Sequence, residues 1–389
     1  MSGIYIHIPF CKQACSYCNF YFVTKDELIP TFLEALLEEV ASTQSPVLSE
    51  PLETIYIGGG TPSRLSSDQI KRLVEVIHWR FDLDWLKEFT VEVNPEDLTK
   101  NWLTSVKQLG VTRLSMGIQS FQPELLKFMH RAHTVRQAHQ ALELLADSGL
   151  KSFSVDLIYG SPGQTEEQLR DDLHCLLSYS PPHVSAYSLT IEPKTRLGKQ
   201  YELGRLQPAC DDDIVKQSRF IRNALFSNGL RQYEVSNYAI PGHEAVHNSA
   251  YWRHENYLGL GPAAHSFYWK PGETSARRWH NPPDLHIYRK PKHTLHYPGI
   301  SNPKITDAKP VEETLSLKTL AEERIMMGLR CVEGISEEEL KAKYNYTFNE
   351  DQKKQLSIFR DEGLMYPENP IRLTKKGFAL VDAITVRIL

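Results

Sequence analysis

The sequence predicts an α/β fold built around a parallel sheet. Short segments rich in β-branched and aromatic residues alternate with longer amphipathic segments six times over the first 240 residues or so. Parallel neighbours need crossover connections, and the amphipathic segments are suited to form them as helices. An open sheet and a full or partial barrel both fit this alternation.

The six expected strands are apolar or alternating runs that end in turn residues or lead into a helical pattern. Runs of this kind are typical of strands covered by helices. They are Ile4–Ile8, Thr54–Ile57, Phe89–Val93, Arg113–Gly117, Phe153–Ile158 and Val184–Leu189.

The segments between these strands show the apolar spacing of helices. In the first of them Leu33, Leu36 and Val40 share one face, and Ser66 or Ser67 would cap the start of the second. The expected helices are Glu27–Ser42, a helix through Ile70 and Ile77, Asn101–Leu109, Pro123–His130, Val135–Ser148 and Glu166–Tyr179.

The composition changes along the rest of the chain, which predicts three parts. Residues 1–240 would form the strand–helix domain, and residues 241–310, rich in His, Tyr, Trp, Pro and Gly, a loop-rich segment. Residues 311–389 would form a small helical domain with a hairpin or wing at Ile371–Gly377. Acidic residues outnumber basic ones from Glu312 onward, whereas nucleic-acid backbones attract positive charge. We therefore expect no nucleic-acid partner.

The composition also excludes several classes of protein. Hydrophobic residues make up 41% of the chain and charged residues 24%, which is typical of globular proteins. No segment approaches the ~18 consecutive apolar residues of a membrane helix, although peripheral association is left open. The first residues, Met1–Tyr5, lack the basic and apolar regions of a signal peptide. We expect a cytoplasmic protein.

Three of the six cysteines, Cys11, Cys15 and Cys18, lie close together directly after the first expected strand. A disulfide framework would distribute its cysteines along a short secreted chain, so this group indicates a metal site. Three thiolates on one loop can hold three irons of a [4Fe–4S] cluster and leave the fourth open to a small molecule. Zinc would normally need a second ligand pair, and free cysteines prefer apolar surroundings. We favour the cluster over these two alternatives.

Glycine and polar residues occur where several expected strands end. The loop Gly58–Pro62 would let a ligand approach the backbone closely, although such a loop is often only a turn. Glu92, Gln119 and Asp156 interrupt apolar strands, where a buried carboxylate needs a partner or a ligand. With the cysteine loop they mark one edge of five strands, and parallel α/β folds bind ligands at that edge.

These motifs resemble those of the radical S-adenosylmethionine (SAM) superfamily. The spacing Cys-x3-Cys-x2-Cys, followed one strand later by Gly-Gly-Gly-Thr-Pro, is similar to that family. The segments Tyr5–Cys11 and Gly117–Phe121 resemble the branch that contains oxygen-independent coproporphyrinogen III oxidase. The resemblance runs from Tyr5 to the C-terminus. It implies an incomplete (β/α)6 barrel with a small, mainly helical C-terminal domain.

Within this branch the oxidase differs from its haem-chaperone relatives. It carries a fourth cysteine two positions after the third, where this chain has Phe20, and an N-terminal extension before the first strand, which begins here at Ile4. The chaperones carry an HNxxYW motif, found here at His247–Trp252. The resemblance thus implies a protein that binds haem and a [4Fe–4S] cluster and delivers haem to apo-haem proteins. The alternative is an active oxidase, and SAM cleavage in the working cycle is left open.

The resemblance also assigns roles to individual residues. It implies cluster ligation by the three cysteines and leaves open a second SAM molecule and a homodimer. The SAM contacts that it implies are Tyr5, Gly59, Glu92 and Arg131, with Gly60, Thr61, Gln119 and Asp156 completing the pocket.

For haem, the resemblance implies His247 as the ligand of the iron. A neutral imidazole is a good axial ligand, and Tyr251 and Trp252 would offer flat apolar area to the porphyrin. From the residues alone, a histidine that is simply hydrogen-bonded in a polar loop is the more common case. His243, His254 and His265 are nearby rivals as ligands, and only the resemblance selects His247.

Overall fold

Six parallel strands form the centre of the computed structural model, which describes residues 2–270, 272–288 and 310–389. Their parallel pairing is what the alternation of strands and helices predicts. Each strand also pairs with the next in sequence order, which is the order of a barrel and which the alternation alone left open. These strands are β1 (Ser2–Ile8), β2 (Leu52–Gly59), β3 (Glu88–Val93), β4 (Arg113–Gln119), β5 (Ser152–Tyr159) and β6 (His183–Ser188).

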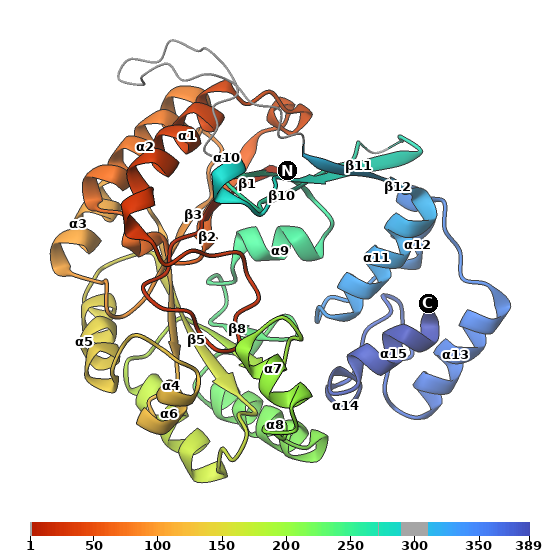
Figure 1. The fold of residues 1–389 in the computed structure, drawn as a ribbon. Coiled ribbons are helices and arrows are strands. Elements are labelled where there is room, and N and C mark those ends of the chain that lie inside the picture. Colours follow the sequence, from red (N-terminus) through yellow and green to blue (C-terminus); the bar gives the residue numbers. More distant parts are fainter. Residues whose placement is uncertain (1, 271, 289–309) are drawn as a thin grey trace.

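Six further strands extend the sheet on both sides. They are β7 (Arg231–Gln232), β8 (Asn237–Ala239), β9 (Asn256–Leu260), β10 (His265–Tyr268), β11 (Ser275–His280) and β12 (Val311–Ser316). The sheet has the order β12-β11-β10-β9-β1-β2-β3-β4-β5-β6-β8-β7. It curves without closing, because β6 pairs with β8 and β1 with β9 (Figure 1). The expected incomplete barrel is confirmed.

The helices of the barrel lie along the outside of this curved sheet (Figure 1). Ser66 caps α2, and three of these helices begin with a capping box in which a glutamine stands three residues after the cap. They are α1 (Ile29–Ser42), α2 (Ser67–Arg80), α3 (Lys100–Gln108), α4 (Pro123–Phe128), α5 (Val135–Ala146), α6 (Glu166–Ser178), α7 (Arg196–Glu202) and α8 (Asp211–Ser227).

The expectation of a loop-rich segment over 241–310 is wrong for much of its described part. This part contains α9 (Val246–Trp252), α10 (Leu285–Tyr288) and the strands β9 to β11. The strands are short, and β9 gains its order from pairing with β1, which lies far away in the sequence. Residues 289–309 of this segment lie outside the described residues.

The C-terminal domain shares its hydrophobic core with the edge of the sheet. Phe267, Trp269, Ala276 and Leu315, on or beside β10 to β12, pack with its helices. In the region of the expected hairpin or wing, one isolated antiparallel bridge joins Met365 to Leu373, and a second joins Ile371 to Ile335. The helices are α11 (Leu317–Leu329), α12 (Glu337–Tyr344), α13 (Glu350–Asp361), α14 (Lys375–Phe378) and α15 (Val381–Ile388).

None of the helices within the described ranges is both long enough and apolar enough to cross a bilayer.

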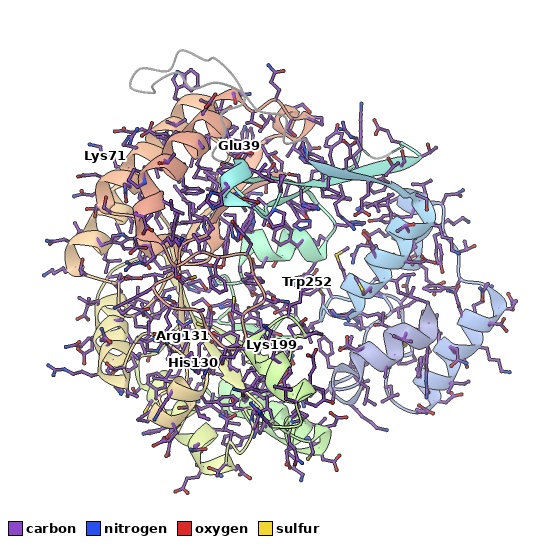
Figure 2. All side chains as sticks on the ribbon, viewed as in Figure 1. Glu39, Lys71, His130, Arg131, Lys199 and Trp252 are labelled. Atoms are coloured by element: carbon purple, nitrogen blue, oxygen red, sulfur yellow. The ribbon has the colours of Figure 1, made fainter. Side chains whose placement is uncertain are left out.

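One carboxylate, Glu39 on α1, ties the added strands to the barrel (Figure 2). It accepts hydrogen bonds from the Gly261 amide after β9 (2.8 Å), the Asn281 side-chain amide after β11 (2.7 Å) and the Tyr288 hydroxyl of α10 (2.6 Å). Three donors from different segments therefore depend on one side chain.

We expect Glu39→Ala to lower the free energy of unfolding by about 2–4 kcal/mol, because partly buried donors lose a charged acceptor. Urea denaturation followed by circular dichroism would measure this change. The control is Glu34→Ala on the same helix, whose ion pair with Arg72 is exposed and contributes about 0–1 kcal/mol. Equal losses in the two variants would contradict the role given to Glu39.

Candidate functional site

A cavity of about 600 Å³ lies at the C-terminal ends of the parallel strands. Its position is that expected of a ligand site in a parallel α/β fold. Twelve of the residues that the sequence singled out as ligands or pocket residues line this one cavity, and the roles given to them stay predictions. They are Tyr5, Cys11, Cys15, Cys18, Gly59, Gly60, Thr61, Glu92, Gln119, Arg131, Asp156 and His247.

The cysteine loop follows β1 and is held in place by its backbone. The Cys11 amide donates to the Val23 carbonyl (3.0 Å), and the Val23 amide donates to the Pro9 carbonyl (2.6 Å), so the loop closes on itself. Further along, the Ser16 amide and hydroxyl donate to the carbonyls of Met129 and Phe128, which anchors the loop to the barrel.

The three thiols are free and influence one another electrostatically. Burial raises the pKa of Cys11 to about 12. The hydrogen bond from Thr61 lowers this pKa, and the neighbouring thiols of Cys18 and Cys15 raise it. Burial also raises the pKa of Cys18. Thiolates so close together need positive charge between them, which iron of a cluster would supply. Over the described residues, no three His, Cys, Asp or Glu side chains form a site for a single metal ion.

The glycine loop after β2 lies directly against the cysteine loop. The Gly60 amide donates to the Ile8 carbonyl (2.9 Å), and a Cβ at Gly60 would lie 3.0 Å from the sulfur of Cys11. Gly59 has φ +112°, and a Cβ there would meet the His7 ring at 2.5 Å. Only glycine permits the His7 ring to approach the backbone this closely, so packing alone requires glycine at this position.

Glu92, at the end of β3, is a carboxylate with an unusual acidity. The Tyr56 hydroxyl and the Gly59 amide donate to it at 2.7 and 3.0 Å. Burial raises its pKa to about 7, the Tyr56 hydrogen bond lowers it, and the nearby Asp156 raises it. Burial likewise raises the pKa of Asp156 to about 6. The cavity therefore holds two carboxyl groups that titrate near neutrality.

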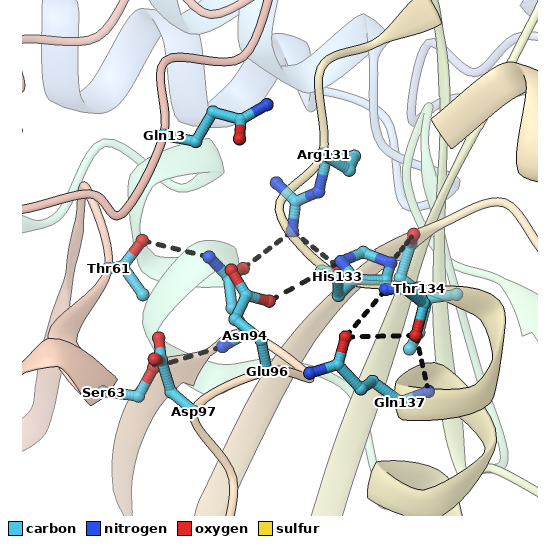
Figure 3. A network of polar contacts seen from close by, with 12 residues as sticks. Gln13, Thr61, Ser63, Asn94, Glu96, Asp97, Arg131, His133, Thr134 and Gln137 are labelled. Carbon is cyan, nitrogen blue, oxygen red and sulfur yellow. Dashed lines mark hydrogen bonds and ion pairs between the residues drawn. The ribbon is translucent and has the colours of Figure 1, made fainter. Parts of the chain in front are cut away.

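The guanidinium of Arg131 is held in a polar network on one wall of the cavity (Figure 3). It donates to the Asn94 side-chain oxygen and the Gly117 carbonyl, both at 2.8 Å, and to the sulfur of Cys15 at 3.4 Å. Asn94 in turn donates to Thr61 at 3.0 Å. This network places a positive charge beside the cysteine loop.

Comparison with known proteins agrees with this geometry. The model of the "Radical SAM superfamily" matches residues 5–176, and that of the "HemN C-terminal domain" matches residues 315–380. A protein of Lactococcus lactis named heme chaperone HemW is 35% identical over 100% of this chain and 97% of its own. The Bacillus subtilis protein of the same name is 33% identical over 99% of this chain and 98% of its own length. The chain belongs to the HemW family of radical SAM proteins.

A solved structure shows the same fold as this HemW-family chain. Coproporphyrinogen III oxidase (HemN) of Escherichia coli, described as a radical SAM enzyme, superposes with a TM-score of 0.79. The superposition covers 100% of this chain and 89% of the HemN chain. The two sequences are 20% identical, so the likeness is one of fold. The Escherichia coli HemW is 37% identical over 68% of this chain and 69% of its own.

His247, the first residue of the HNxxYW motif, lies on α9 and is only 1% exposed. Its Nδ1 is 2.8 Å from the Thr54 hydroxyl, its Nε2 is 2.8 Å from the Tyr251 hydroxyl, and its ring stacks on Tyr56. Burial lowers its pKa to about 3. Iron ligation through Nε2 would first require the Tyr251 hydroxyl to leave. Trp252, at the end of α9 (Figure 2), lines neither this cavity nor the second one described below.

The sequence did not single out several residues of the site. Asn94 directly follows β3, so the reasoning applied to Glu92 would have found it. Tyr56 was missed because tyrosine is common in strands. Glu96 and His133, in contact below Arg131 at 3.6 Å, follow no strand-end pattern (Figure 3). They become neighbours only through the fold.

We expect Glu92→Gln to stabilise the metal-free protein increasingly as the pH rises. The carboxyl has a pKa of about 7 when folded and about 4.5 when unfolded, so its charge opposes folding above pH 4.5 and fully above pH 7. The stability difference should grow by about 3 kcal/mol between pH 4 and pH 8. Urea denaturation across this range measures it, with Glu124→Gln on the exposed face of α4 as the charge-matched control. A constant difference would contradict the raised pKa.

Proposed function

We propose that the chain is a radical SAM haem chaperone, which binds a [4Fe–4S] cluster, SAM and haem and delivers haem to apo-haem proteins in the cytoplasm. One observation carries the proposal. Three free thiols of one loop line a cavity with carboxyl groups and a guanidinium, in a chain whose full-length relatives are named heme chaperone HemW.

Cys11, Cys15 and Cys18 would hold the cluster, which when bound can supply an electron to SAM. The chain's own residues then tune the sulfur ligands. The Thr61 hydroxyl lies 3.6 Å from the sulfur of Cys11, and Arg131 lies 3.4 Å from that of Cys15. Hydrogen bonds of this kind stabilise the negative charge of ligating thiolates.

The charges of the cavity suit SAM, which carries an ammonium, a sulfonium and a carboxylate group. Glu92 and Asp156 offer negative charge and Arg131 positive charge, so each end of the molecule has a complementary partner. Buried Gln119 retains a side-chain oxygen without a hydrogen-bond partner among the described residues, which leaves an acceptor for a ligand. We keep the contacts given by the resemblance: Tyr5, Gly59, Glu92 and Arg131, with Gly60, Thr61, Gln119 and Asp156.

Oxidation of coproporphyrinogen III is the second candidate function. The fold likeness to HemN favours it. Against it stands Phe20, which occupies the position of the oxidase's expected fourth cysteine and is 64% exposed. The names of the full-length relatives support the chaperone rather than the oxidase.

Replacing Cys11, Cys15 or Cys18 by serine should remove most of the cluster, because the cubane loses one of its three protein ligands. Anaerobically reconstituted wild-type protein should contain about four irons and four acid-labile sulfides per chain. Cys175→Ser on α6, outside the cavity, is the control and should keep the wild-type content. One tightly held zinc without labile sulfide would refute the cluster.

The protein should bind haem and transfer it to an apo-globin, but it should not form protoporphyrinogen IX. Haem transfer is followed by the absorption of the receiving globin. The oxidase reaction is tested anaerobically with coproporphyrinogen III, SAM and an electron donor, with HemN as positive control. Robust turnover would replace the chaperone proposal by the oxidase, and absence of haem binding would refute it.

A further inference from the structure

A second cavity, of about 740 Å³, lies between the barrel and the C-terminal domain. Side chains of the cysteine loop, of β9 to β11 and of α11 line it. We infer that this second cavity is the haem site and that His265 on β10 ligates the iron. This assignment rests on the proposed haem chaperone function and names the site at which haem would bind.

The walls of the second cavity suit a flat, mostly apolar ligand. Phe20, Tyr257 and Phe267 supply aromatic area, and Met326 and Met327 add two thioethers from α11. Aromatic rings stack on flat ligands, and a thioether is itself a known haem ligand. A volume of this size falls within the range of cofactor pockets, about 300–1,000 Å³.

Only one of the histidines lining the two cavities has a ring without a hydrogen bond in the described structure. His7 contacts the Tyr5 hydroxyl and the Tyr21 carbonyl, each at 2.9 Å. The Nδ1 of His254 has a hydrogen bond with the Tyr344 hydroxyl (3.4 Å), whereas its Nε2 lies 3.4 Å from Glu323 without a hydrogen bond. In the first cavity, His183 and His247 each have a hydrogen-bond partner at both ring nitrogens.

His265, in contrast, is solvent-exposed, and both its nitrogens are available. It stands opposite His280 in the β10–β11 pair, and the two rings stack at 4.8 Å. The Nδ1 of His280 lies 3.0 Å from the Asn281 carbonyl, which orients that ring. The stack therefore holds the His265 ring at the cavity without using its nitrogens.

The charges around His265 favour the neutral imidazole that iron requires. The residue is exposed but its ring is partly enclosed, and this partial burial lowers its pKa. His280 and Arg278 lower the pKa further, whereas Glu313 raises it. Two acidic residues line the cavity, but Glu255 pairs with Arg253 and Glu323 with Arg278. Neither presents an uncompensated negative charge to the propionates of haem.

This assignment gives the HNxxYW motif a different role from the expected one. Tyr251 lines both cavities, and its hydroxyl is held by His247 at 2.8 Å. His247 would then position the wall between the two cavities. Ligation at His265 breaks no such hydrogen bond, which is why the structure favours it over His247.

The test is a haem titration of the cluster-loaded full chain, followed by difference absorption spectra and by electron paramagnetic resonance of the ferric haem. We expect His265→Ala to weaken haem binding at least tenfold and to shift the Soret band, and added imidazole to restore the spectrum. His243 lines neither cavity, so His243→Ala should behave like wild type. Met326→Glu should also weaken binding at least tenfold without changing the iron–sulfur content, which covers the case that His265→Ala misfolds.

Three results would overturn the inference: loss of the haem spectrum in His247→Ala with a wild-type spectrum in His265→Ala, wild-type binding in both variants, or wild-type binding in Met326→Glu. Failure of the wild-type chain to bind any haem is a separate outcome, which refutes the proposed function itself. The two failures are therefore distinguishable.

Discussion

The parallel pairing of β1 to β6 in sequence order is the constraint on which the site depends. Because neighbouring strands run the same way, all their carboxyl ends meet at one rim, and everything that follows a strand is delivered there. The cysteine loop, the glycine loop, Glu92, Gln119 and Asp156 come together for this reason alone. The same rim then requires partners for buried charge, and Tyr56, Gly59 and Asn94 provide them.

The sequence was sufficient where periodicity is strong and partners are near. The six strands, the capped helices and the rim residues follow from local patterns. It was insufficient where order comes from remote pairing, as for β9, which pairs with β1. It also missed α8, because the many charged residues of this helix obscure its apolar stripe. The hydrogen bonds of His247 and the contact between Glu96 and His133 depend on packing, which no spacing in the sequence specifies.

Two neighbouring cavities with different linings are the main result for function. The first is rich in charged groups and thiols, and the second in aromatic rings and thioethers. Tyr5, Asn19, Phe20 and Tyr251 line both. These four side chains therefore form the wall that the two cavities share.

The hydrophobic core shared by the C-terminal helices and β10 to β12 affects how the molecule can be divided. Phe267, Trp269 and Ala276 belong to that core although they precede residue 311 in the chain. Cutting the chain between the barrel and the helices would expose apolar side chains on both fragments. The second cavity would lose one of its walls at the same time, because α11 supplies its methionines. The two domains therefore share one hydrophobic core and together enclose the second cavity.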